Sequence, residues 1–502
     1  MLKSGIIVAL LTLLSRFFGL ARELFIAATF GTSYIADCVN VAFKLPNLFR
    51  RIFAEGALSA VFIPMFSKKL HSSKEEALEF GGKIFTILFF VLVVLTIVLQ
   101  LAMPYLMMII APGFFLEDTK FDLAVILCRI TMPYMVFISI TALFGGVLNS
   151  VKKFAAFAFT PIIMNICIIT LTPLLEAKYT AHFGVVYSLI IAGILQVVFM
   201  YYCLIRAKLK IGFLFSNSND SDVRKLARKM TPAAMSSGVQ QINLFISQSI
   251  ASFLPGAVSI LSYADRLYQL PLSLIGVTFG TILLPELSYI YKKQDYSNAN
   301  KLQNRSIRIA LVISIPAMCG LLALSHPIIH LIYERGEFSA SDAIDVARAL
   351  SAFSFGLPAF VLAKILTPIF YANLDTKTPF RITLYSLVTN TVLNILLMIP
   401  FGYVGIAVGS SIAAWFNLFL LNKYAKNYGE FRITYETKIF IFKVLVSSVF
   451  MVLFIEIAEY HFGELFFSDS FMIKALSLLG TIATAIVIFV LFSYLSKMHK
   501  VL

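Results

Sequence analysis

Residues 84–110 read IFTILFFVLVVLTIVLQLAMPYLMMII, a run of 27 residues without a single Asp, Glu, Lys or Arg. A helix of about 20 apolar residues crosses the hydrocarbon of a bilayer, so this run is long enough for a membrane span. The rest of the chain has the same character, since 59% of its 502 residues are hydrophobic and only 13% are charged. Soluble domains carry about a quarter charged residues. The composition therefore predicts an all-α polytopic membrane protein and excludes a soluble globular domain.

Apolar segments bounded by polar or turn residues recur along the whole chain and predict fourteen transmembrane helices. Their expected ranges are 4–29, 34–52, 84–110, 123–148, 156–175, 184–205, 231–253, 261–290, 309–333, 344–371, 382–400, 404–421, 444–460 and 471–496. The first is expected to be retained as a helix, because its apolar run continues past Phe30 without a cleavage signal.

The net charge of +15 is mainly a topological signal. Of the 41 Lys and Arg residues, 28 fall in loops on one side of the predicted membrane, three fall on the other side, and ten lie within the spans. Cytoplasmic loops carry the excess of Lys and Arg in membrane proteins. We therefore expect both termini in the cytoplasm, and with no soluble domain to carry a basic face, nucleic-acid binding is excluded.

The two halves of the chain resemble each other at an offset of about 224 residues. Ala36-Asp37 pairs with Ala264-Asp265, Leu45-Pro46 with Leu270-Pro271, and Gly113 with Gly336. This offset spans six helices, an even number, so the copies would share one orientation, as in carriers whose substrate lies between two lobes. We expect a first lobe at 1–215, a second at 216–430 beginning with a cytoplasmic linker, and two extra helices within 431–502.

Charged residues inside the predicted spans are the first candidates for a binding site, because a charge at the bilayer centre costs at least about 2.5–3.5 kcal/mol. The ten cations are Arg16, Arg22, Lys44, Arg50, Arg51, Arg129, Arg266, Arg348, Lys364 and Lys474. Arg16 and Glu23 share one face of the first helix. A polar stripe along the second helix comprises Asp37, Asn40, Lys44, Asn47 and Arg51, and Pro46 would kink it.

Arginines that converge from both lobes would form a cationic cavity. Because the guanidinium stays charged and presents a planar fork of donors, it suits phosphate or carboxylate groups. The residues therefore predict a carrier of an anionic, phosphate-bearing substrate. The five cysteines form no CxxC pair, and neither a Walker A loop nor an HExxH or GxSxG motif occurs, so an enzyme is disfavoured.

Three stretches resemble one known family. They are residues 15–23, SRFFGLARE; residues 41–59, VAFKLPNLFRRIFAEGALS; and residues 263–271, YADRLYQLP. With Asp375-Thr-Lys-Thr-Pro379, they are similar to the MurJ/MviN lipid II flippases of the multidrug/oligosaccharidyl-lipid/polysaccharide superfamily. The resemblance covers essentially the whole chain.

The resemblance implies a carrier that moves the diphosphate-linked disaccharide-pentapeptide head of lipid II across the bacterial inner membrane by alternating access, for peptidoglycan synthesis. The family's essential arginines map onto Arg16, Arg22, Arg50 and Arg266, and its acidic residue maps onto Asp37. Glu23, Lys44, Asn47 and Arg51 complete the candidate binding set. The two extra helices would form a groove for the lipid tail.

The resemblance also implies coupling to a sodium ion or to the membrane potential, with Asp375 as the one matched candidate ligand and no other cofactor. The partners would be lipid II and membrane lipids, and association with other cell-wall synthesis proteins is left open. The helical phase favours Arg51 as the cavity-facing residue, whereas the family pattern favours Arg50. Three alternatives remain open: another polysaccharide-lipid flippase, a drug antiporter of the same superfamily, or a polyprenyl-phosphate-binding membrane enzyme or scaffold.

Overall fold

The computed structural model describes residues 2–49, 51, 61–215, 220–428 and 431–498. Every regular element within these ranges is helical, as predicted. The chain divides into two compact units, Met1–Val258 and Ser259–Leu502, each with its own interior. The sequence also predicts a short half-helix or amphipathic extension at residues 53–65, after the second span, but this stretch lies largely outside the described residues.

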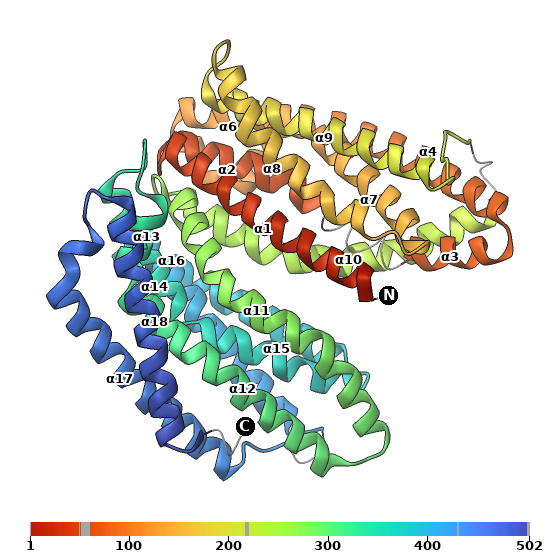
Figure 1. Cartoon of the computed structure of the whole chain (residues 1–502). Helices are drawn as coiled ribbons and strands as arrows, with labels where there is room; N and C mark the ends of the chain where they lie inside the picture. Colours follow the sequence, from red (N-terminus) through yellow and green to blue (C-terminus); the bar gives the residue numbers. More distant parts are fainter. Residues whose placement is uncertain (1, 50, 52–60, 216–219, 429–430, 499–502) are drawn as a thin grey trace. The chain divides into compact units, whose positions relative to one another are not determined.

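The first unit consists of long helices and a few short connecting ones (Figure 1). Its elements are α1 (Leu2–Phe30), α2 (Tyr34–Phe49), α3 (Ile63–Ser72), α4 (Lys74–Leu101), α5 (Met103–Ile110), the 3₁₀ helix η2 (Pro112–Leu116), α6 (Asp118–Thr131), α7 (Tyr134–Ser150), α8 (Ala155–Glu176), α9 (Ala181–Arg206) and α10 (Ser221–Ala251). Helix α8 packs along both α1 and α9, while α2 packs along α6. Buried apolar side chains such as Leu143, Val185 and Leu189 form the interior between them.

Helix α10 packs with the first unit, where it contacts α4, α5 and η2. Ion pairs hold its N-terminal end: Lys83 Nζ lies 2.9 Å from Asp220 Oδ2, and Lys69 Nζ lies 2.7 Å from Asp222 Oδ2. The sequence repeat counts this helix as the first of the second lobe, beginning at residue 216. That assignment rests on internal homology rather than on packing, so the lobe boundaries stay a prediction.

A close approach of backbones fixes the other end of α10. The amide of Gly113 in η2 donates a hydrogen bond to Ser252 Oγ at 2.9 Å. A Cβ at residue 113 would lie 2.3 Å from the backbone nitrogen of Phe253. Only glycine therefore permits η2 to lie against the end of α10. This close approach explains why the sequence has glycine at position 113, one member of the repeated Gly113–Gly336 pair.

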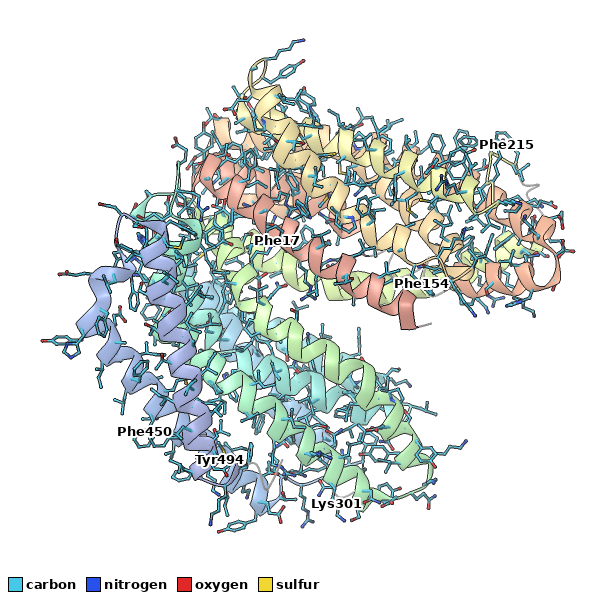
Figure 2. All side chains as sticks on the ribbon, in the orientation of Figure 1. Phe17, Phe154, Phe215, Lys301, Phe450 and Tyr494 are labelled. Atoms are coloured by element: carbon cyan, nitrogen blue, oxygen red, sulfur yellow. The ribbon has the colours of Figure 1, made fainter. Side chains whose placement is uncertain are left out.

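The second unit is also wholly helical within its described residues. Its elements are α11 (Ala257–Lys292), α12 (Tyr296–Ala323), α13 (Ser325–Tyr333), α14 (Ala340–Ser354), α15 (Leu357–Ala372), α16 (Lys377–Ala425), α17 (Tyr435–Phe466) and α18 (Phe471–Leu495). Helices α17 and α18, the last two, pack side by side (Figure 1). Phe450 of α17, labelled in Figure 2, stacks on Phe492 of α18 with the ring centroids 4.1 Å apart.

Helix α16 is interrupted at Gly402, which adopts φ 57° and ψ −137°. Beyond this point the chain folds back: a Cβ on Gly405 would lie 2.0 Å from the carbonyl oxygen of Leu397, and a Cβ on Gly409 would lie 2.4 Å from Asn394 Oδ1. The break coincides with the boundary predicted between the spans 382–400 and 404–421. A tight helical hairpin can form here because Gly402 adopts a left-handed φ and because Gly405 and Gly409 have no Cβ to collide with the preceding helix.

Each predicted span falls on one or two helices, although the number of spans remains a prediction. Among the described residues, nine helical stretches are long and apolar enough to cross a membrane, and one of them, Lys377–Ala425, contains the hairpin at Gly402. Large apolar side chains also cover much of the outer surface, for example Leu101, Ile109 and Leu174 at 70% exposure or more. Such exposure suits helices that face lipid rather than water.

The Gly402 hairpin leads to a prediction about stability. Replacing Gly405 by alanine puts a methyl group against the Leu397 carbonyl and should destabilise the fold by about 1–3 kcal/mol. Thermal unfolding of the purified protein in detergent measures this as a lower Tm. Gly480→Ala is the matched control, because nothing lies within 4 Å of that Cβ position and alanine favours a helix. Equal Tm values for the two variants would contradict the tight packing of the hairpin.

Candidate substrate-binding residues

Arg22 lies at the C-terminal part of α1 and is 9% exposed. Its Nη2 donates to Glu23 Oε1 at 2.6 Å, and its guanidinium carbon lies 5.7 Å from the centre of the Phe43 ring of α2. The carboxylate and the aromatic face offset the loss of hydration that burial imposes on the guanidinium. The structure thus brings together Arg22 and Glu23, two of the predicted residues.

The Nε–H of Arg22 is buried without a hydrogen-bond partner among the described residues. An unsatisfied buried donor costs about 1–3 kcal/mol, and more when the group is charged. Such a group calls for a specific explanation. An anionic oxygen of a bound ligand would satisfy this donor, because arginine forms strong hydrogen bonds with such oxygens.

Arg16 is exposed and lies about two turns before Glu23 on α1. The neighbouring turn of α1 contacts a polar residue of α8 that the sequence interpretation missed. Asn165, 3% exposed, donates from Nδ2 to the carbonyl oxygen of Ser15 at 3.4 Å, and its Oδ1 has no partner within the described chain. A Cβ on Gly19 would lie 3.6 Å from this amide. The small side chain of residue 19 thus lets α8 approach α1.

Asp37 is completely buried at the start of α2 and is bound from two other elements. Lys120 Nζ of α6 donates to its Oδ2 at 2.9 Å, and the amide of Gly256, just before α11, donates to the same oxygen at 3.1 Å. Lys120 is itself only 3% exposed, with its ammonium 4.3 Å from the centre of the Phe114 ring. This buried ion pair joins α2, α6 and the turn that follows α10.

The remaining stripe residues of α2 have different environments. Asn47 donates from Nδ2 to the carbonyl oxygen of Phe43 in its own helix, while Lys44 is exposed. Arg51 donates from Nη1 to Gln241 Oε1 of α10 at 3.1 Å. Arg50 lies outside the described residues, so the choice between the two arginines stays open.

Two cations predicted within spans have local partners. Arg129 of α6 donates from Nε to the carbonyl oxygen of Gln100, whose amide donates back to the Arg129 carbonyl at 2.7 Å. Lys474 of α18 lies 3.2 Å from His330 Nε2, and His330 Nδ1 lies 2.6 Å from Glu334 Oε2. These contacts give both cations a role in helix packing.

In the second unit, Arg266 is exposed on α11. Its neighbour Asp265 accepts a short hydrogen bond from the amide of Gln269 one turn later. Position 269 carries an amide rather than a carboxylate, so it cannot form an ion pair with Arg266. The Gln269 amide binds Asp265 instead.

Asp375 lies between α15 and α16 and caps α16. Its Oδ1 accepts hydrogen bonds from the amides of Lys377 and Thr378 at 3.0 Å, and its Oδ2 accepts a short bond from the hydroxyl of Tyr428. Burial raises the pKa of this carboxyl, but the bonds from Thr378 and Tyr428 outweigh it and lower the pKa to about 2. The group is therefore ionised at neutral pH, as a sodium ligand requires, although capping alone accounts for its contacts. The described residues contain no cluster of three or more His, Cys, Asp or Glu suited to a metal ion.

Comparison with known proteins decides the family. The profile of "Lipid II flippase MurJ" matches residues 26–495. The chain is 53% identical over 495 residues to the probable lipid II flippase MurJ of Rickettsia prowazekii (strain Madrid E), covering 99% of this chain and 97% of that one. The chain belongs to the lipid II flippase MurJ family. A second relative, the probable lipid II flippase MurJ of Rhizobium tropici, is 42% identical over 83% of this chain and 79% of its own.

Solved structures agree with the MurJ assignment. A lipid II flippase MurJ in an inward closed conformation matches with a TM-score of 0.81 at 26% identity, covering 99% of this chain and all of that one. An inward-facing multidrug resistance transporter of the MATE family matches with a TM-score of 0.70 at 15% identity, over 84% of this chain and 97% of that one, and shows the shared fold alone. The family and the superfamily fold expected from the sequence are confirmed, and the chain is a multi-pass membrane protein.

The Asp37–Lys120 pair leads to a prediction about folding. Lys120→Met leaves a buried carboxylate without its cation and should destabilise the protein by about 3–5 kcal/mol. The double variant Asp37→Asn/Lys120→Met removes both charges and should recover most of the loss. Thermal unfolding in detergent measures both effects, with Lys178→Met as the control at an exposed loop lysine. A single variant as stable as its control would show that the pair is dispensable.

Proposed function

We propose that this chain binds the diphosphate and sugar head of lipid II through arginines of its membrane helices and carries it to the outer leaflet by alternating access. Arg16, Arg22, Arg50 and Arg266 would bind the anionic head in a cationic central cavity. Membership of the MurJ family supports the substrate. The observation that carries the site assignment is the buried Nε–H of Arg22, a charged donor with no partner among the described residues.

Arginine suits this task better than lysine. A guanidinium presents several donors in a plane, and it is less strongly hydrated than an ammonium group, so it can bind two phosphate oxygens at once after water is removed. Glu23 would hold the Arg22 fork in a fixed orientation through its 2.6 Å bond. A cationic drug would be repelled by the same arginines, which disfavours an antiporter of cationic drugs.

The other predicted residues would have secondary roles. Lys44 and Arg51 add positive charge along α2, and Asn47, whose Nδ2 is bound to the helix backbone, adds a polar amide beside them. Asp37 would act indirectly, because its carboxylate is fully buried and bound to Lys120. We assign Asp37 to the positioning of α2.

The last two helices would bind the polyprenyl tail. Apolar side chains on α17 and α18 are widely exposed, including Phe442 at 67%, Leu476 at 65% and Val487 at 64%. A lipid tail of the substrate is chemically equivalent to the bilayer that covers such surfaces, so it can lie along them while the head group is carried. We therefore propose that residues 431–502 form the lipid-tail groove.

The setting of this transport would be the bacterial inner membrane, with both termini in the cytoplasm. The 28 cations on one side and three on the other support that orientation. Lipid II and the surrounding membrane lipids would be the direct partners, and other proteins of cell-wall synthesis would supply and consume the substrate.

Arginine variants test the proposed site. Each of Arg22→Ala and Arg266→Ala should lower lipid II transport at least about tenfold, because a charge-assisted hydrogen bond contributes about 1.5–3 kcal/mol. Arg22→Lys should recover only part of the activity, since lysine lacks the fork. The measurement is the amount of lipid II in the outer leaflet of cells in which the chain replaces the native flippase.

Two controls separate binding from folding. Arg432→Ala removes an exposed arginine near the start of α17 and should leave transport unchanged. Protein level in the membrane and Tm are measured for every variant. Full transport by a stable Arg22→Ala/Arg266→Ala double variant would exclude the proposed cationic site.

Coupling to sodium is a separate proposal, in which the ionised Asp375 supplies one oxygen ligand. Asp375→Asn should abolish the dependence of transport on sodium while leaving transport driven by the membrane potential. Asp375→Asn also alters the cap of α16, so a control for this structural effect is needed. Tyr428→Phe serves as that control, because it removes one hydrogen bond to Asp375 without removing the charge. Sodium dependence that persists in a stable Asp375→Asn protein would exclude this ligand.

A further inference from the structure

A cavity of about 360 Å³ opens in the first unit where the α7–α8 turn meets the last turns of α9 and the beginning of α1. Three cations line it: Lys152 and Lys153 from the turn, and Arg206 from α9. Its apolar walls include Ile7, Phe154 (labelled in Figure 2) and Tyr202. Its volume lies within the range of about 300–1,000 Å³ that is typical of ligand pockets.

The charge in this cavity is of one sign. Among the described residues that line it, none is Asp or Glu. The guanidinium of Arg206 lies 5.3 Å from the centre of the Tyr202 ring, which orients it by a cation–π contact. Three like charges repel one another, so an anion that enters the cavity relieves this repulsion as well as binding.

The second unit contains the same turn with the opposite charge. Lys153 donates from its amide to the Leu148 carbonyl at 2.9 Å, and Asp375 donates likewise to Phe370 at 2.9 Å. In each turn the preceding residue has a left-handed φ, 62° at Lys152 and 59° at Leu374. In each, the next helix begins two residues later.

These hydrogen bonds align Lys153 with Asp375, an offset of 222, whereas matching identical residues near the repeat offset of about 224 pairs Lys153 with Lys377. The difference of two residues arises because identical side chains, rather than the turn geometry, guided the sequence pairing. In the second unit the carboxylate of Asp375 supplies the anion at the start of α16 and accepts the Tyr428 hydroxyl bond. In the first unit a lysine takes this place, and its ammonium cannot accept a bond from the amides that begin α8.

We propose that the cavity formed by Lys152, Lys153 and Arg206 binds the phosphate of an anionic phospholipid from the surrounding leaflet. The phosphate would take the position that a built-in carboxylate has in the second unit. The acyl chains would extend along Ile7, Phe154 and Tyr202, which are exposed and apolar or aromatic. The site is separate from the candidate residues for the transported head group.

A lipid fits this cavity better than a soluble anion does. The combination of basic side chains with an apolar wall matches a molecule that has a phosphate at one end and hydrocarbon at the other. Basic pockets between membrane helices on the cytoplasmic side are known to suit such head groups. The excess of Lys and Arg predicts that this end of the first unit is cytoplasmic, where anionic lipids give the leaflet a negative potential.

The test uses the full chain in phosphatidylcholine vesicles that contain phosphatidylglycerol. A tryptophan replaces Tyr202 in a Trp415→Phe background, which makes it the single tryptophan of the chain. Brominated phosphatidylglycerol should quench this tryptophan more strongly than brominated phosphatidylcholine at the same mole fraction. Lys153→Asp, which copies the second unit, should lower the relative affinity for phosphatidylglycerol at least about fivefold, the effect expected per cation.

Lys210→Asp is the matched control, because it makes the same charge change just beyond α9 on a residue that does not line the cavity. It should leave the lipid preference unchanged. Arg206→Ala is a second variant that leaves the α7–α8 turn intact and should also lower the preference. Equal quenching by the two lipids, an unchanged preference in both cavity variants, or an equal loss in Lys210→Asp would overturn the proposal. Reversal of the quenching by excess inorganic phosphate would overturn it as well, by showing that the cavity takes a free anion.

Discussion

The cost of placing a charge in an apolar, poorly hydrated environment governs this protein more than any other constraint. A buried ion keeps its charge only when a partner and hydrogen bonds offset its lost hydration. Lys120 and Asp37 meet this requirement in full, since the ammonium lies on an aromatic ring and the carboxylate accepts a backbone amide as well. Because these partners come from α2, α6 and the turn between α10 and α11, the need to pair one carboxylate determines how three segments meet.

The helices follow from the apolar pattern, because a membrane span must satisfy its backbone polar groups internally and helices do so. The break at Gly402 was also predictable, since Pro400 and Gly402 interrupt an otherwise continuous apolar run. The residues that pair with the buried charges were not predictable from the sequence. Lys120 is one of the three cations that the sequence predicts in loops on the side opposite the cytoplasm, whereas the structure places it in the first turn of α6, buried against Phe114.

Asn165 and Gln241 were missed for a related reason. A single polar residue in an apolar helix has no periodic signal, and its significance depends on which helix lies opposite. Asn165 becomes informative only when α8 packs on α1 at Ser15, and Gln241 only when α10 brings its amide to Arg51. Such contacts join residues 150 and 190 positions apart. Spacing along one helix predicts which residues share a face, but it does not predict what that face meets.

Two corresponding turns show how a duplicated fold can acquire distinct electrostatics without a change of backbone. The turns before α8 and α16 have the same left-handed residue and the same hydrogen bond, yet one carries Lys153 and the other Asp375. The backbone tolerates either side chain because the hydrogen bond that closes each turn is made by backbone atoms alone. The positive charge at the first turn therefore has no carboxylate in the corresponding position, whereas the second turn contains one in Asp375. Under our proposal, the phosphate of an anionic lipid in the surrounding membrane provides the missing negative charge.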